Sequence, residues 1–260
     1  MIMSCLVALA VIGPAGATSF STDNSDLWLT KNEDGWGVQI VHRADVMFAT
    51  IYVYDADRFP VYYTATLVYA GTNSAGNAVW VGDLYLTNGP WFGAPVFSSS
   101  QVTYRKVGQI AYVPQLVETG LLAYSVDGVT VNKQIYRYTL RNDDYAGTFV
   151  GAFKVTASGC SNSANNGSQL IRATFTVTQT ASSLRIVSNS DQGVSCNYPG
   201  DYQQFGQFGQ TRGAYLCSTG ENGAYTLFEM NVAYDDMRGR MVGTNNLGCS
   251  LSGNFSAIRQ

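Results

Sequence analysis

The chain has few charged residues and a single histidine, and both scarcities limit the chemistry it can perform. Charged residues make up 13% of its 260 positions, and the net charge is −3. Nucleic acids and anionic membranes select a basic face, so this balance disfavours both partners. With one histidine and no C-x-x-C spacing, nothing indicates a zinc site. A Ser-His-Asp triad would have to use His42, and no G-x-S-x-G elbow accompanies it. We expect neither a metal nor a cofactor.

The N-terminus has the layout of a secretory signal peptide. Residues 1–11 form an apolar run without a charge, Pro14 breaks it, and Ala15-Gly16-Ala17 offers a small-x-small cleavage site. The run is shorter than the roughly 20 residues that span a bilayer. No other long apolar run follows, so we expect no transmembrane segment in the mature chain. The prediction is a signal peptide over 1–17 and export, either to the periplasm or out of the cell.

Cysteines are also few, and their distribution is uneven. Four follow the predicted signal peptide, and all lie in the second half of the chain: Cys160, Cys196, Cys217 and Cys249. An even number of cysteines in an exported protein favours disulfides over a metal site. We therefore expect two structural disulfides in the C-terminal half.

What the chain has in abundance is aromatic residues, at 13%, and short segments of alternating polarity. No segment shows a helical period, which predicts an all-β protein. A boundary at 141–144 divides it into antiparallel domains over 24–142 and 145–260, each with about eight strands. Asp127-Gly128 is the clearest hairpin turn. The expected strands are 35–42, 46–54, 61–69, 77–86, 101–107, 109–113, 119–126 and 129–139, then 147–158, 170–180, 183–189, 193–203, 212–218, 223–233, 237–244 and 249–258.

Sequential strands with short connections favour an up-and-down barrel or a sandwich. In a closed eight-stranded barrel the first and last strands of the second domain would be neighbours. That arrangement predicts Cys160–Cys249 and Cys196–Cys217, although four cysteines allow three pairings. Large residues at alternating positions favour filled interiors over hollow ones. The biased segment 203–210 is expected at a hairpin tip or as a flap over a barrel mouth.

Residues 26–139 contain ordered motifs that resemble a repeat unit of exported bacterial proteins with no established activity, often found as tandem copies. Residues 28–37 resemble its W-W-N-P-x-E-S-G-W-G segment, and 42–50 its H-Q-G-D…I-F-A-T-W-F stretch. Residues 82–93 are similar to G-D-L-Y-x-T-x-G-P-x-F-G, and 124–128 to Y-x-V-D-G. Leu29 replaces the second tryptophan, so a binding face made by paired tryptophans would be weakened here. The second half is only generally lipocalin-like, and an architecture does not fix a function.

Two sets of side chains in the first domain are candidates for a site. Glu33, His42 and Asp45 are ionisable groups near aromatic residues, and an acid/base site would need them to converge. The alternative is that Glu33 satisfies backbone donors in its turn while the other two flank a hairpin. Trp28, Trp36 and Trp91 would suit a platform for a sugar or peptide, or would fill the core. Trp91, beside Pro90, is the strongest exception to a core role.

These features favour a non-catalytic binding or envelope-associated module for an unknown small molecule, glycan or protein. Scarce ionisable groups and abundant aromatic residues are the basis of this interpretation. One alternative is a hydrolase of envelope or extracellular polymer that uses Glu33 and Asp45. Another is an inhibitor of an exported enzyme, with the 203–210 tip as a wedge.

Overall fold

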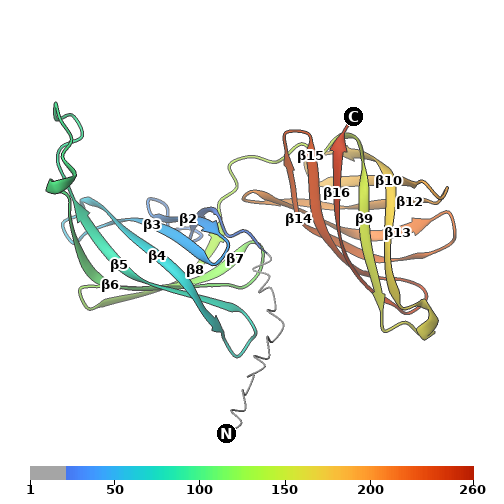
Figure 1. Cartoon of the computed structure of the whole chain (residues 1–260), viewed down its shortest axis with the longest axis horizontal. Coiled ribbons are helices and arrows are strands. Elements are labelled where there is room, and N and C mark those ends of the chain that lie inside the picture. The colour runs from blue at the N-terminus through green and yellow to red at the C-terminus, as the bar shows by residue number, and fades with distance from the viewer. Residues whose placement is uncertain (1–21) are drawn as a thin grey trace, which may run out of the picture.

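The protein consists of two closed antiparallel β-barrels that follow one another along the chain (Figure 1). The computed structural model describes residues 22–260, so the predicted signal peptide lies outside the described residues. Each barrel has eight strands in simple up-and-down order, which confirms the predicted fold class and selects the barrel over the sandwich. None of the helical segments in 22–260 has the length and apolarity to cross a membrane.

The first barrel differs from the predicted strand list at two places. Its strands are β1 (Asp26–Leu29), β2 (Gly37–Arg43), β3 (Val46–Tyr54), β4 (Pro60–Thr72), β5 (Ala78–Asn88), β6 (Thr103–Pro114), β7 (Thr119–Val126) and β8 (Val129–Arg137). The short strand β1 was not predicted. The segments predicted as 101–107 and 109–113 form one strand, β6, because a register shift opposite Leu84 and Tyr85 lets the ladder continue past Val107.

Side chains fill the interior of the first barrel. Alternation along β2 and β3 turns Val38, Ile40, Met47 and Ile51 inward, as period two requires. Trp28, Trp80 and Tyr112 are fully buried among them and supply much of the core volume. The first barrel is therefore a packed core, as the sequence predicted.

The second barrel has all eight predicted strands, with shifted boundaries. They are β9 (Gly147–Ser158), β10 (Gly167–Gln179), β11 (Ser183–Ser190), β12 (Ser195–Phe205), β13 (Phe208–Cys217), β14 (Asn222–Ala233), β15 (Asp236–Thr244) and β16 (Ser250–Arg259). β16 pairs with β9 and closes the barrel. Its core includes Tyr145, Phe149, Phe175 and Met230.

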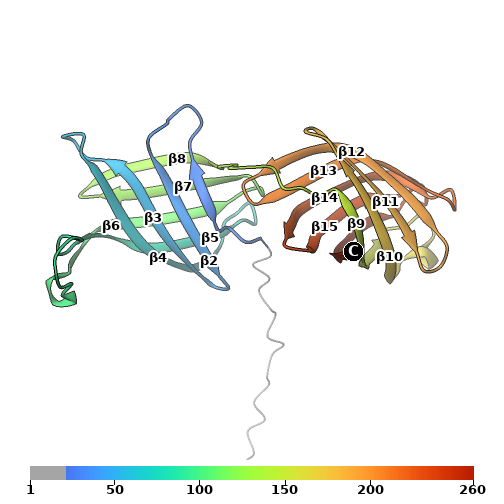
Figure 2. The ribbon, with the colours of Figure 1, turned by 90° about the horizontal axis from the view of Figure 1, so that it is seen from above.

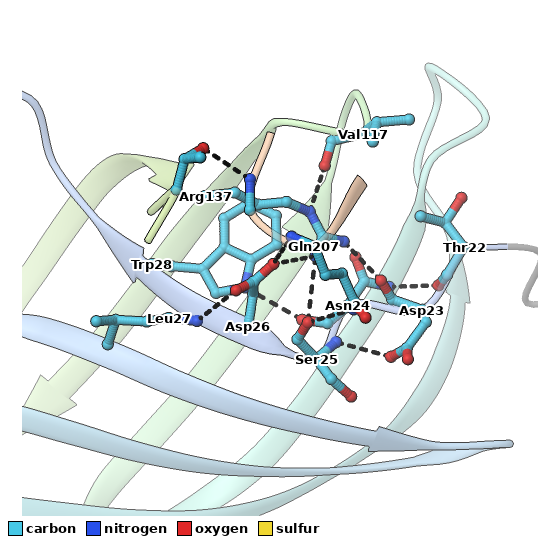
Figure 3. Close-up of polar contacts among 12 residues, drawn as sticks. Thr22, Asp23, Asn24, Ser25, Asp26, Leu27, Trp28, Val117, Arg137 and Gln207 are labelled. Atoms are coloured by element: carbon cyan, nitrogen blue, oxygen red, sulfur yellow. Dashed lines mark hydrogen bonds and ion pairs between the residues drawn. The ribbon is translucent and has the colours of Figure 1, made fainter. Parts of the chain in front are cut away.

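The two barrels follow one another along the long axis of the molecule, and one end of the first barrel contacts one end of the second (Figure 2). Arg137, in the last strand of the first barrel, is at the centre of this junction (Figure 3). Its guanidinium is fully buried, bonds to Asp26 Oδ2 at 3.0 Å, and also donates to backbone carbonyls. It lies between the rings of Trp28, at 4.5 Å, and Phe208 of the second barrel, at 5.0 Å. Its hydrogen bonds all go to the first barrel and the segment before it, so Arg137 holds that end of the first barrel together and contacts the second barrel through the ring of Phe208.

The 203–210 segment is a hairpin tip, as one of the two expectations predicted, and it is not a flap over a barrel mouth. It is mostly strand, because Phe205 and Phe208 pair across a two-residue turn of Gly206 and Gln207. Gln207 donates through its backbone to Asp26 and through its side chain to the carbonyl of Ser25 (Figure 3). The turn is therefore held against the first barrel, and it is not exposed as an inhibitory wedge.

Candidate functional site

The end of the second barrel that is farther from the junction is hollow. A cavity of about 470 Å³, here called the cup, opens between the loops that join β9 to β10, β11 to β12, β13 to β14, and β15 to β16. All eight strands contribute to its lining. This volume lies within the range of small-molecule sites, about 300–1,000 Å³. The prediction of a filled interior is therefore wrong for this half of the second barrel. Lining residues include Phe153, Val155, Ala157, Ser188, Tyr198, Tyr215, Glu221, Tyr225, Met241 and Leu251.

Both disulfides lie at the rim of the cup. The bridge Cys160–Cys249 ties the loop after β9 to the segment before β16, across the closure of the barrel. The bridge Cys196–Cys217 joins two residues that face each other on β12 and β13. The predicted pairing is confirmed. Because each bridge ties neighbouring strands where the ladder ends, the two together hold the mouth in shape.

Three tyrosines form one wall of the cup. The rings of Tyr198 and Tyr215 are stacked with centroids 5.3 Å apart, and Tyr225 meets Tyr198 edge-on at the same distance. Burial raises the pKa of Tyr198 and of Tyr225 to about 12. The three phenols therefore stay neutral near pH 7, and the wall offers uncharged aromatic rings to a ligand.

Glu221 is the one acidic side chain that lines the described cup. Its Oε1 accepts from the hydroxyl of Tyr215 at 2.9 Å and from the amide of Asn245 at 3.2 Å. Both of its hydrogen bonds within the described chain go to this oxygen, which leaves Oε2 able to accept from a guest. A carboxylate fixed in this way favours an ammonium or another hydrogen-bond donor.

The bottom of the cup is apolar. A further space of about 40 Å³ lies among large apolar side chains, which close the barrel toward the junction. Phe153 and Phe175 meet edge-on there, with ring centroids 6.1 Å apart. A guest would thus find one carboxylate near the rim, among neutral polar side chains such as Ser190, Gln192 and Asn245, and hydrocarbon below it. The other apolar side chains of this floor are Val155, Ile186, Leu227, Met237, Met241 and Phe255.

The ionisable candidates of the first barrel do not form a site. Glu33 precedes β2 and the exposed Asp45 follows it, so the strand separates them by about 20 Å at the usual rise per residue. Carboxyl pairs in glycosidases are about 5–10 Å apart. Glu33 bonds instead to Lys133 at 2.7 Å and to the indole of Trp36 at 2.9 Å. The hydrogen bond from Lys133 holds the pKa of Glu33 below its ordinary value. Side chains, and not the backbone donors we expected, satisfy this carboxylate.

His42 has a structural role. Its buried ring accepts the N–H of Asn24 at Nδ1, over 3.2 Å, and its Nε2 lies 2.9 Å from the carbonyl oxygen of Ala44. Since Nδ1 accepts, Nε2 is the protonated nitrogen and donates to that carbonyl. Both ring nitrogens are used, and neither is left for a substrate.

The three tryptophans that were candidates for ligand binding lie in different environments. Trp28 is buried in the core and donates from its indole to the carbonyl of Asn24. Trp36 is half-buried in the loop between β1 and β2. Trp91 is 69% exposed in the connection between β5 and β6. The structure therefore does not assemble them into one platform, and Trp91 is the exception to a core role that the sequence suggested.

Other depressions are less suited to a small guest. One of about 960 Å³ is an open groove on the outer face of the first barrel, lined by residues such as Phe48, Val68 and Val81. No group of three or more His, Cys, Asp or Glu side chains within 22–260 is placed to hold a metal ion. The cup is the enclosed site with both an apolar floor and a polar contact.

The fold and the cup place the protein among small barrels with a hollow end. Comparison with protein-family models and with curated proteins found no match. Among solved structures, one similar chain is described as a de novo design of a fluorescence-activating β-barrel. The two are 19% identical, with a TM-score of 0.27, over 45% of this chain and 94% of that chain. We draw no functional conclusion from that likeness.

Proposed function

We propose that the chain is an exported, non-catalytic binding protein whose second barrel holds a small apolar molecule that carries a hydrogen-bond donor. The observation that supports this function is the cup itself, with hydrocarbon at its floor and Glu221 on its wall. Burial of the guest's apolar part provides the affinity, at roughly 25 cal/mol per Å² removed from water. The carboxylate provides the orientation.

The wall favours a positively charged head group over a negative one. Glu221 repels an anion and attracts an ammonium, and the faces of the neighbouring tyrosine rings attract cations as well. The class of ligand we propose is therefore an amine-bearing amphiphile, with its apolar part on the floor and its head near Glu221.

Two further features support the proposal. Disulfides persist in oxidising compartments, which suits a protein exported by its predicted signal peptide. Glu33 and Asp45 are about one strand length apart, and Glu33 is engaged with Lys133 and Trp36, which argues against the hydrolase alternative.

The test is calorimetric titration with decylamine, decanol and decanoate, which share a tail and differ in head group. We expect decylamine to bind most tightly and decanoate least. Glu221→Gln should weaken decylamine about tenfold, because the attraction between the carboxylate and the ammonium is lost, and should weaken decanol less, because decanol carries no charge.

A matched pair of variants on β9 locates the binding site. Ala157→Phe places a large ring in the cup, whereas Ser158→Phe, one residue on, points outward because side chains alternate along a strand. Loss of binding in the first variant alone supports the cup. Equal binding by both variants, or no binding of any of the three compounds by the unaltered protein, would overturn the proposal.

A further inference from the structure

A long connection projects from the end of the first barrel that lies away from the junction. Residues 89–102, here called the arm, join β5 to β6 and include the short helix η1 (Ser99–Gln101). The other hairpin connections in the described chain have two to eight residues. The arm extends beyond the barrel as the green segment at the upper left of Figure 1 and the lower left of Figure 2. Connections of this length without a strand of their own usually have a function.

The arm exposes large apolar side chains. Trp91, Phe92, Val96 and Phe97 are 69%, 94%, 78% and 66% exposed, and none belongs to the core of the barrel. No charged residue occurs between Asp83 and Arg105. The arm thus exposes several large apolar side chains that stability of the barrel does not require, and exposed apolar side chains that gather in one segment mark interaction sites.

Polarity changes in a definite order from the arm to the barrel. Behind the apolar arm come tyrosines, with the rings of Tyr85 and Tyr104 at 6.0 Å and the hydroxyl of Tyr62 accepting from Thr87. Two ion pairs, Arg105–Asp127 and Lys106–Asp83, begin among these tyrosines, since Arg105 follows Tyr104 and Lys106 lies opposite Tyr85. An apolar tip followed by tyrosines mixed with charged residues is the arrangement of segments that enter a lipid interface.

We propose that the arm inserts into the interface of a lipid surface. Because each cation at its base is paired with a carboxylate, apolar burial drives the contact and attraction to anionic lipid does not. The inserted depth is shallow. Internal hydrogen bonds satisfy only a few backbone N–H groups of the arm, those of Gly89, Ala94, Gln101 and Val102, and the others must keep contact with water or head groups.

Flotation with phosphatidylcholine vesicles tests the proposal, with Trp91→Ser/Phe92→Ser as the variant. Both side chains are exposed, so the variant keeps its fold. We expect the unaltered protein to float with vesicles and the variant to bind at least about tenfold more weakly. Leu170→Ser/Ile258→Ser, which changes two side chains exposed at 69% and 64% on the second barrel, is the matched control and should float like the unaltered protein.

Fluorescence gives a second, independent measurement. Trp28 and Trp80 are buried and Trp36 is half-buried, so in a Trp36→Phe background quenching by brominated phosphatidylcholine reports mainly on Trp91. Strong quenching by lipid brominated near the head group, weaker by lipid brominated at the chain end, supports shallow insertion. Three results would overturn it: no flotation, flotation only with anionic lipid and only at low salt, or a loss of self-association in the variant without loss of lipid binding.

Discussion

Asp26 in the first strand accepts a hydrogen bond from the backbone of Gln207, 181 positions further along the chain, at 3.0 Å. The same oxygen, Oδ2, is bonded to Arg137. The neighbouring Gly206 has φ +56°, and a Cβ there would lie 2.1 Å from that oxygen, so the turn approaches closely only because this residue is glycine. A single carboxylate thus links the closure of the first barrel to the second barrel.

Removing the buried cation of the junction should destabilise the protein strongly. Arg137→Met leaves Asp26 without its charged partner, and breaking a buried pair in this way costs about 3–5 kcal/mol. Arg105→Met is the matched control, since Arg105 also pairs with an aspartate but is 57% exposed, and we expect little change from it. Urea unfolding measures both. Similar losses in the two variants would show that burial of Arg137 does not matter.

The two disulfides should contribute unequally. They join residues 89 and 21 positions apart, and a longer loop restricts the unfolded chain more. From loop entropy we expect losses of about 4.6 kcal/mol for Cys160→Ser/Cys249→Ser and about 3.4 kcal/mol for Cys196→Ser/Cys217→Ser. Urea unfolding of both double variants under oxidising conditions is the measurement. The reverse order would mean that native contacts at the rim outweigh loop entropy.

Stability near the junction should depend on pH through Asp143. Burial raises the pKa of this carboxyl above its ordinary value, so folding favours the protonated form. The protonated carboxyl therefore stabilises the folded protein at low pH. This contribution is lost as the pH rises from about 4, the pKa of an aspartate in the unfolded chain, through the higher pKa of Asp143 in the folded protein. We therefore expect the gain in stability of Asp143→Asn over the unaltered protein to be larger at pH 7 than at pH 4.

Urea unfolding at the two pH values measures this difference. Asp191→Asn, at an exposed position in the loop between β11 and β12, removes the same charge and controls for the change in net charge. A difference between Asp143→Asn and the unaltered protein that is equal at pH 4 and pH 7 would contradict the prediction.

Period-two alternation was enough to predict two antiparallel domains of about eight strands, because each strand buries one face, but it left the barrel and the sandwich as alternatives. The cysteine pairing followed from closure, since in an eight-stranded up-and-down barrel Cys160 and Cys249 must be neighbours. β1 was missed because it has four residues and makes few pairs. The merging of two predicted strands into β6 depends on a register shift in its partner, β5, which a local pattern does not show.

The site was harder to predict because hollowness depends on how side chains from eight strands meet. Tyr198, Tyr215 and Tyr225 have the same alternation as the residues that fill the first barrel, yet here the rings line a cavity. Glu221 lies in a hairpin loop and carried no motif. Arg137 was likewise unpredicted, because its partners come from distant segments of the chain. The bacterial repeat unit and the signal peptide stay predictions.

The brief pairing of β1 has a mechanical consequence. β1 is joined to β2 at three positions and to β8 at two, whereas β16 is joined to its neighbours at nine and ten positions, next to the Cys160–Cys249 bridge. Tension applied between the two chain ends would therefore peel β1 away first and open the first barrel, while the second barrel resists. Under tension, the second barrel, which contains the cup, would stay folded longer than the first barrel, which carries the arm.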